Sequence, residues 1–297
     1  MPELPEVETI KNDLQKVILG KKITNIEIRG GKTVNPVINF EFLNGVKNKP
    51  EVFFKILKNN FFSGISRIGK LLIFEIAGGK NFLLIHLKMT GQLIFLGKGK
   101  MVAGGHETGG EKELPNKHTR IIFSFGDKEK LFFNDLRKFG YAKIVDAPEL
   151  GKIREKYGIE PLTKNFTFKA FSKAIKGKNA SIKAILLNQG VVAGIGNIYA
   201  DEALFEAKIR PERRANALSE SEKRVLFQSI NKIIKIAIKS RGTTFSSYVD
   251  ANGQKGGFTK LLKVYGREGE KCRRCRGIIK KTKVAGRGTR YCEKCQK

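Results

Sequence analysis

The sequence has no tryptophan, only three histidines and four cysteines among 297 residues, and about half as many acidic as basic residues. No apolar run reaches the roughly 18 residues that a membrane-spanning helix needs. The first residues are acidic where a signal peptide would be basic. We therefore expect neither a transmembrane segment nor a signal peptide, and a cytoplasmic location.

Positive charge is what the sequence has in abundance. Lysine and arginine total 58 against 28 aspartates and glutamates, which gives a formal net charge of +30 at pH 7. A field of this strength holds polyanions, with nucleic acid first and an acidic membrane surface second. The 40% of hydrophobic residues suffices for buried cores and excludes a disordered chain. The length predicts two domains, with room for a small third.

The apolar pattern changes along the chain. Residues 5–19 have the spacing of an amphipathic helix, and short β-type runs between 22 and 146 predict an antiparallel sandwich or barrel. The glycine-rich stretch 97–117 is expected to be a mobile loop. Four helices are predicted after it, at 166–176, 180–187, 197–207 and 219–239. The last begins with a capping box of Ser219 and Glu222, and the expected fold class is multidomain α+β.

All four cysteines lie in the last 26 residues, as Cys272, Cys275, Cys292 and Cys295. The spacing Cys-x2-Cys-x16-Cys-x2-Cys suits four thiolates around one tetrahedral Zn²⁺. Disulfides are the alternative, but a chain without an export signal has little need of them. A zinc ion bound in this way would be structural, because four cysteines leave no coordination position open.

The N-terminus places three carboxylates beside a proline in an otherwise basic chain. Interaction with the helix dipole is an ordinary role for Glu8 and one of two interpretations of Glu6. Pro2 and Glu3 precede the helix, so capping explains them less well. Removal of Met1, the usual processing before proline, would leave Pro2 with a secondary amine of pKa about 8. Its attack on a sugar C1′ would give an iminium, with Glu3 supplying or taking the proton.

Six blocks of the sequence resemble the bacterial formamidopyrimidine-DNA glycosylase family: MPELPEVET, HLKMTG (86–91), DLRKFG (135–140), GIGNIYADEALF (194–205), VYGREGEKC (264–272) and the terminal pair of CxxC motifs. They occur in the family's order and span nearly the whole chain. The resemblance implies an N-terminal helix and antiparallel β-sandwich over 1–148. It implies a helical helix-two-turn-helix domain over 149–266 and a four-cysteine zinc finger over 267–297.

The resemblance also implies five catalytic residues. Pro2 matches the nucleophile, Glu3 the proton donor to the sugar ring, and Glu6 its support. Lys70 matches a second acid–base group, although without the family an ordinary strand-end cation explains it equally well. Arg287 matches the arginine that contacts the phosphate at the lesion and assists the second elimination; alone, it would be one more basic residue of the finger.

Chemistry on a base inside a duplex requires the nucleotide to be extruded, which leaves a hole. Met89, Arg137 and Phe139 match the family's void-filling residues: Phe139 as a wedge, Met89 in the apolar gap and Arg137 on the orphaned partner base. Taken alone, Met89 and Phe139 would more readily be core residues, but they lie in polar loops that end in glycine. The other positions that match DNA contacts are His118, Asn179, Lys183 and Asn197. Asn179 stands where the family commonly has a lysine.

The predicted function is a bifunctional DNA glycosylase and AP lyase of base excision repair. It would excise oxidised purines, such as 8-oxoguanine and formamidopyrimidines, through a Schiff base on Pro2 followed by β,δ-elimination. The expected partner is damaged double-stranded DNA, with one structural zinc, no obligate protein partner, a monomeric state and a nucleoid-associated cytoplasmic location. Two alternatives stay open: an endonuclease VIII-like glycosylase for oxidised pyrimidines, and a zinc-ribbon DNA-binding protein without activity.

Overall fold

A computed structural model describes the chain at residues 1–29, 50–97, 99–106, 113–126, 128–243, 248–249 and 256–297. The chain divides into two compact units: unit 1 is Met1–Arg154 with Arg241–Gly256, and unit 2 is Glu155–Ser240 with Gly257–Lys297. The domain boundaries expected from the sequence stay predictions. Within the described ranges, none of the helices combines the length and apolarity of a membrane span.

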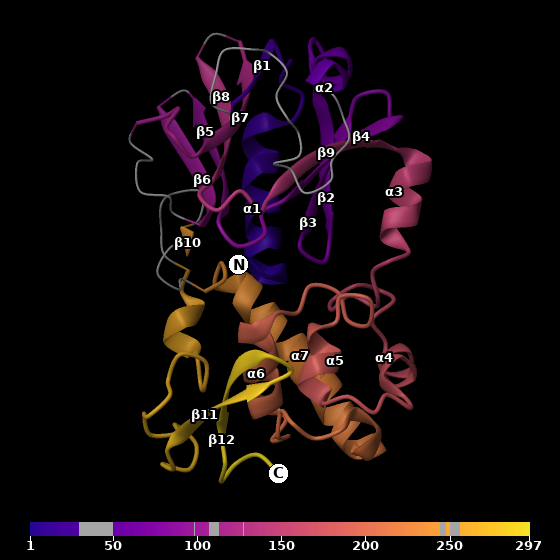
Figure 1. Cartoon of the computed structure of the whole chain (residues 1–297), viewed down its shortest axis with the longest axis vertical. Coiled ribbons are helices and arrows are strands. Elements are labelled where there is room, and N and C mark those ends of the chain that lie inside the picture. Colours follow the sequence, from indigo (N-terminus) through magenta and orange to yellow (C-terminus); the bar gives the residue numbers. More distant parts are fainter. Residues whose placement is uncertain (30–49, 98, 107–112, 127, 244–247, 250–255) are drawn as a thin grey trace. The chain divides into compact units, whose positions relative to one another are not determined.

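Unit 1 is built on two antiparallel sheets (Figure 1). Its strands are β1 (Asn25–Ile28), β2 (Phe62–Ile68), β3 (Leu71–Ile76), β4 (Asn81–His86), β5 (Gly91–Gly97), β6 (Lys100–His106), β7 (Thr119–Phe125), β8 (Glu129–Asp135), β9 (Tyr141–Asp146) and β10 (Tyr248–Val249). The larger sheet has the order β1-β7-β8-β5-β6-β10 and the smaller one β2-β3-β4-β9. The predicted antiparallel β region is confirmed.

The helix α1 (Leu4–Ile18) packs against both sheets of unit 1. Its apolar side chains, among them Val7 and Ile10, are buried as their spacing predicts. It contacts β2 and β3 in one sheet and β5 and β6 in the other. Phenylalanines fill much of the space between the elements; the rings of Phe62 and Phe74 have centroids 5.2 Å apart.

Strand β6 falls where the glycine-rich sequence predicts a loop. A Cβ on Gly104 would lie 2.4 Å from Cγ1 of Ile10, and one on Gly105 would lie 2.3 Å from the carbonyl oxygen of Gly91. Gly105 also has φ of +125°. These glycines let β6 lie close to α1 and β5, so here glycine serves packing and not mobility. The mobile-loop prediction is wrong for 100–106, and residues 107–112 lie outside the described ranges.

Two helices of unit 1 were not predicted from the sequence, α2 (Pro50–Leu57) and α3 (Ala147–Arg154). Each has eight residues, a length at which apolar periodicity does not separate a helix from a strand. Helix α2 contacts β1, and α3 contacts β4 and β9.

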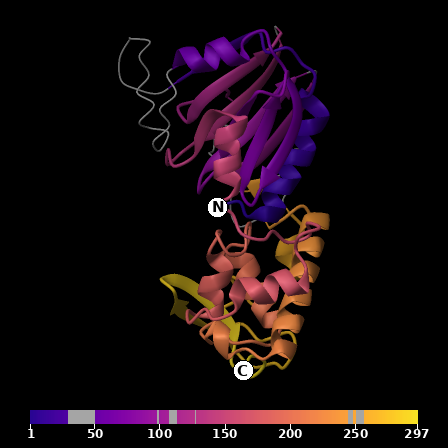
Figure 2. The same ribbon diagram turned by 90° about the vertical axis from the view of Figure 1, so that its right-hand side faces the viewer.

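Unit 2 is mainly helical (Figure 2). Its helices are α4 (Phe168–Ile175), α5 (Ile182–Leu187), α6 (Asn197–Glu206) and α7 (Glu220–Lys239), each within two residues of the predicted ends. The predicted capping box is present, with Ser219 Oγ accepting from the Glu222 N–H and the Glu222 carboxylate accepting from the Ser219 N–H. A hairpin of β11 (Ile279–Val284) and β12 (Arg287–Cys292) follows. The multidomain α+β fold class is confirmed.

Candidate functional site

The first residues of the chain lead directly into α1. Pro2 is buried, and Met1 before it is 52% exposed. The nitrogen of Pro2 is an amide in the full chain and becomes an amine when Met1 is removed. Glu3 is the N-cap residue of α1 and is buried.

Glu6 is buried next to Glu3 and accepts hydrogen bonds from two segments of unit 1. Its carboxylate accepts from the backbone N–H of Glu3 at 2.9 Å and from the backbone N–H and hydroxyl of Thr243 at 2.8 and 3.1 Å. A Cβ on Gly242 would lie 2.6 Å from Glu6 Oε1, so any side chain there would displace the carboxylate. Gly242 thus leaves room for the Glu6 carboxylate, and Thr243 binds it. The same carboxylate accepts the hydrogen bond from the backbone of Glu3.

Lys70 lies in the turn between β2 and β3 and is 6% exposed. The next residue, Leu71, pairs with His86 on β4. Burial, with repulsion from Lys88 and Lys70, lowers the pKa of His86 to about 3. The imidazole is therefore neutral at pH 7; its Nδ1 accepts from the Lys88 N–H at 3.0 Å and its ring lies 5.6 Å from that of Tyr141.

The three predicted void-filling residues come together from two loops of unit 1. Met89 follows β4, whereas Arg137 and Phe139 follow β8. The guanidinium of Arg137 lies 4.6 Å from the ring centroid of Phe139, and its Nη1 lies 3.5 Å from Sδ of Met89. Met89 is 44% exposed and Phe139 41% exposed, so the alternative that they are core residues is wrong. Two exposed apolar side chains and one cation form a single cluster.

In unit 2, two residues that are predicted to contact DNA, Lys183 and Asn197, bind the backbone at the start of β12. Asn197 Nδ2 donates to the carbonyl oxygen of Gly288 at 2.9 Å. Lys183 is fully buried, with its ammonium 2.6 Å from a carboxylate oxygen of Asp201 and 3.3 Å from the same Gly288 carbonyl oxygen. Arg287, the residue before Gly288, is exposed. Both side chains therefore fix the backbone that presents Arg287 to solvent.

Glu202, one turn into α6, fixes the segment that leads into the cysteine module. Its buried carboxylate accepts from the backbone N–H groups of Lys263, Val264 and Tyr265, each at 2.9 Å. Burial raises the pKa of Glu202, and these three hydrogen bonds oppose that rise. Glu202 therefore anchors residues 263–265 to α6.

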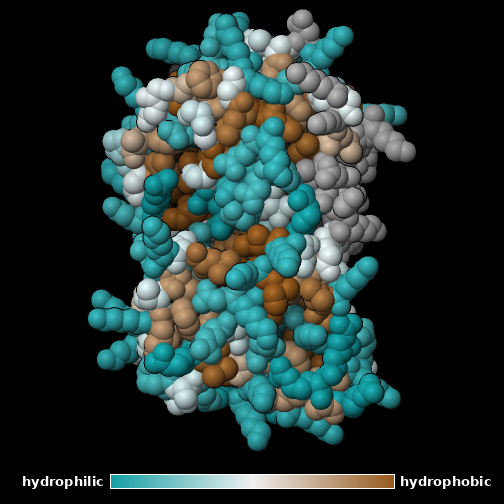
Figure 3. Space-filling model, turned by 180° about the vertical axis from the view of Figure 1, so that it is seen from behind, coloured by the Kyte–Doolittle hydropathy of each residue, from teal (hydrophilic) through white to brown (hydrophobic). Residues whose placement is uncertain are grey.

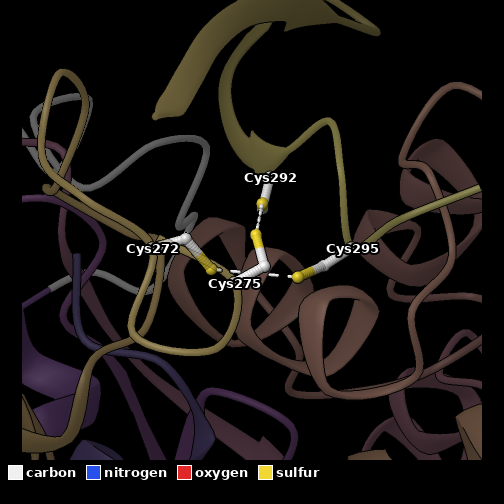
Figure 4. A group of neighbouring side chains, drawn as sticks. All are labelled: Cys272, Cys275, Cys292 and Cys295. Atoms are coloured by element: carbon white, nitrogen blue, oxygen red, sulfur yellow. Dashed lines mark hydrogen bonds between the residues drawn. The ribbon is translucent and has the colours of Figure 1, made fainter. Parts of the chain in front are cut away.

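The four cysteines converge on one point (Figure 4). All four sulfur atoms lie within 4.8 Å of one another, and all four thiols are free, so the disulfide alternative is wrong. The separations are 3.4 Å for Cys275 to Cys292 and 3.9 Å for Cys272 to Cys295. Sulfur atoms about 2.3 Å from a tetrahedral zinc ion lie nearly this far apart. The donor set and its spacing fit zinc.

Three family models match the chain. The formamidopyrimidine-DNA glycosylase N-terminal domain matches residues 1–142, its H2TH domain residues 157–249, and a zinc finger found in FPG and IleRS residues 269–297. A formamidopyrimidine-DNA glycosylase of Carboxydothermus hydrogenoformans is 42% identical over the full length of both chains. The chain belongs to the formamidopyrimidine-DNA glycosylase family. A Listeria monocytogenes relative of the same name is 39% identical, again over the full length of both chains.

Solved structures of the formamidopyrimidine-DNA glycosylase family agree with this membership. A mutant Lactococcus lactis FPG in complex with DNA containing Fapy-dG is 37% identical, covers 100% of both chains and has a TM-score of 0.82. A MutM complex with DNA containing carbocyclic 8-oxo-G is also 37% identical, with full coverage and a TM-score of 0.83. Wild-type Lactococcus lactis FPG with DNA containing an oxidised pyrimidine is 38% identical with full coverage and scores 0.82.

Two further positions matched to the formamidopyrimidine-DNA glycosylase family lie at the surface or near it. Asn179, the departure from the family's lysine, is exposed between α4 and α5. His118 is half-buried just before β7. Of the glycine-rich residues 252–257, only 256–257 lie within the described ranges. Sequence reasoning did not identify Thr243 or Asp201, because their roles arise only when distant segments meet.

Proposed function

We propose that this chain is a bifunctional DNA glycosylase and AP lyase of base excision repair that removes oxidised purines from duplex DNA. The observation that carries the proposal is the exposed cluster of Met89, Arg137 and Phe139. When a nucleotide is extruded, it leaves a gap in the duplex. A wedge between the bases, an apolar filler and a hydrogen-bonding cation together can fill that gap. The proposed partner is damaged double-stranded DNA, and the proposed state is a monomer in the cytoplasm, associated with the nucleoid.

In the proposed reaction the processed Pro2 amine attacks C1′ of the damaged nucleotide and the base leaves. Glu3 donates a proton to the sugar ring oxygen, the ring opens, and the nitrogen and C1′ form an iminium. The iminium accepts the electrons released when a 2′ proton is lost, so the 3′ phosphate leaves by β-elimination. A second proton loss expels the 5′ phosphate by δ-elimination, which leaves a one-nucleoside gap. Glu6 holds Glu3 in place, and Lys70 is the second acid–base group.

The proposed DNA contacts use both the net charge of +30 and the contacts of unit 2. Hydrophilic side chains cover much of the face shown in Figure 3. Arg287 contacts the phosphate at the lesion, and Asn197 fixes the backbone beside it. Lys183 is fully buried, so its proposed contribution passes through the Gly288 carbonyl that it holds. A single zinc ion on the four cysteines keeps this hairpin folded.

The test is borohydride trapping on lesion-containing duplexes. An active enzyme gives a covalent adduct with DNA carrying 8-oxoguanine, and Pro2→Gly weakens it severely. Glu3→Gln is the matched control: it blocks trapping on 8-oxoguanine but spares trapping on a preformed abasic site, whose sugar ring opens without enzyme. Retention of Met1 by a change that prevents processing abolishes both adducts. A preparation that excises the base but forms no adduct would overturn the Schiff-base mechanism. A preparation that binds lesion DNA with neither excision nor adduct would leave a DNA-binding protein.

A second candidate substrate is an oxidised pyrimidine, because a wild-type relative has been crystallised with DNA containing one. Excision from 8-oxoguanine and thymine-glycol duplexes, measured side by side, separates the two. Faster release of the oxidised pyrimidine would assign the endonuclease VIII-like specificity to this chain.

A further inference from the structure

Asp135 is the last residue of β8 and is only 1% exposed. Its Oδ1 accepts from the Thr90 hydroxyl at 2.5 Å and from the Arg137 N–H at 3.2 Å. Its Oδ2 accepts from the Gly140 N–H at 2.6 Å. Thr90 follows Met89 in one loop, and Arg137 and Gly140 lie in the other. One buried carboxylate therefore holds both loops that carry the exposed cluster.

The backbone of Asp135 is fixed as firmly as its side chain. Its N–H donates to the carbonyl oxygen of His118 at 2.9 Å. Its carbonyl oxygen accepts from Nε and Nη2 of Arg120 at 3.1 and 2.9 Å. His118 is another residue matched to DNA contacts, so the same residue also fixes a third segment.

Both loops contain a residue in a backbone conformation that side chains disfavour. Lys88 has φ of +48° and Lys138 has φ of +58°. A Cβ on Gly140 would lie 3.0 Å from Asp135 Oδ2, so the carboxylate and the second loop fit closely. Strained turns of this kind persist only where their surroundings hold them. The Asp135 hydrogen bonds provide that restraint.

The hydrogen bonds of Asp135 and Thr90 position the Met89, Arg137 and Phe139 side chains through the peptide group of Arg137. The Arg137 N–H is shared between Asp135 Oδ1 and Thr90 Oγ1, the second at 2.9 Å. This fixes the residue whose guanidinium stacks on Phe139 and reaches the sulfur of Met89. Loss of the Thr90 hydroxyl or of the Asp135 carboxylate would let the two loops move independently.

We propose that Asp135, acting with Thr90, is the positioning residue for the void-filling cluster. It contacts neither the damaged base nor the reacting atoms; it keeps two strained loops in the one arrangement in which the wedge, the filler and the arginine act together. This inference rests on the proposed function, because it assumes that the cluster enters the duplex.

The test compares Thr90→Val, which removes the hydroxyl, with Thr90→Ser, which keeps it. Three readouts are needed: excision of 8-oxoguanine from a duplex, the fluorescence of 2-aminopurine placed beside the orphaned base, and trapping on a single-stranded abasic oligonucleotide. A single strand has no partner base and so needs no void filling. Asp135→Asn adds a test of the carboxylate, since its amide N–H would face the Gly140 N–H.

We expect Thr90→Val and Asp135→Asn to lower duplex excision by about 10- to 100-fold, the loss that small misplacements cause. The 2-aminopurine signal should fall with it, while single-strand trapping stays within about twofold of wild type. Thr90→Ser should rescue both duplex readouts. Equal duplex activity and fluorescence for Val and Ser, or an equal loss on single strands, would overturn the inference. An inactive wild type would instead refute the proposed function, so the two failures are distinct.

Discussion

The β-sandwich and the cysteine module hold their functional residues by different means. In unit 1, a large apolar core of helix and sheet side chains supports the strand ends and loops that carry Lys70 and the Met89 cluster. In the cysteine module, β11 buries only Ile279 and Val284 at its two ends. Its small apolar cluster consists of the four cysteines with Ile279, Val264 and Phe205 of α6. A module of this size lacks the burial needed to fold unaided, so we expect a metal ion on the four cysteines to supply much of the free energy of folding.

The largest expected effect follows from this contrast. Replacement of Cys292 by serine should release zinc and unfold the hairpin, because structural zinc contributes on the order of 10–16 kcal/mol in such modules. Unit 1 should stay folded. Zinc content and hydrogen exchange resolved along the chain measure both outcomes. Loss of exchange protection in β3 and β4 together with β12 would contradict the contrast.

The matched control for that experiment is Arg287→Ala. It removes the exposed cation of the hairpin but should keep zinc and exchange protection. Lesion-DNA affinity should fall by about 10- to 100-fold, the effect of one lost charge-assisted contact worth about 1.5–3 kcal/mol. If Cys292→Ser weakens binding no more than Arg287→Ala does, the finger acts on DNA mainly through Arg287.

The second prediction concerns the buried ion pair of unit 2. Lys183 pairs with Asp201 at zero exposure, and Asp201 also accepts from the Arg290 N–H at 2.9 Å. Lys183→Met leaves a buried carboxylate without its cation and should cost about 3–5 kcal/mol of unfolding free energy in unit 2. Adding Asp201→Asn should restore most of it. Denaturant unfolding followed by hydrogen exchange measures the stability of unit 2 in the single and the double variant. A double variant as unstable as Lys183→Met alone would contradict the prediction.

Sequence and structure agree where the pattern is local. Apolar runs located most strands, and the Ser219 capping box located the start of α7. The glycines of β6 led to the wrong prediction of a loop, because glycine is common both in mobile loops and where two backbones approach closely. The contacts that organise the sites were beyond the sequence: Thr90 and Asp135 are 45 positions apart and meet only across paired strands. Met89 and Phe139 were assigned to one cluster through resemblance alone.

The third prediction is that acid weakens unit 1 through His86. Burial lowers the pKa of His86 in unit 1 to about 3, so its contribution to stability is full above about 6.5 and is lost as pH falls toward 3.

Exchange protection in unit 1, followed from pH 7 to pH 4, measures this effect. Acidification should lower the protection of unit 1, and His86→Gln should flatten the trend. A loss of protection in unit 1 that His86→Gln leaves unchanged would contradict the assignment to His86.

The smallest expected effects test how far tight packing governs unit 1. Gly104→Ala would place a Cβ 2.4 Å from Ile10 Cγ1, so α1 and β6 must separate, at a cost of about 1–3 kcal/mol. Gly151 in α3 is the matched control, because a Cβ there meets nothing within 4 Å. Gly151→Ala should therefore stabilise unit 1 by about 0.5–1 kcal/mol through helix propensity. Chemical denaturation should show opposite shifts for the two variants, while zinc binding stays unchanged in both. If Gly104→Ala left the free energy of unfolding unchanged, α1 and β6 could separate at no cost. Unit 1 and the cysteine module would then differ only in the size of their apolar cores.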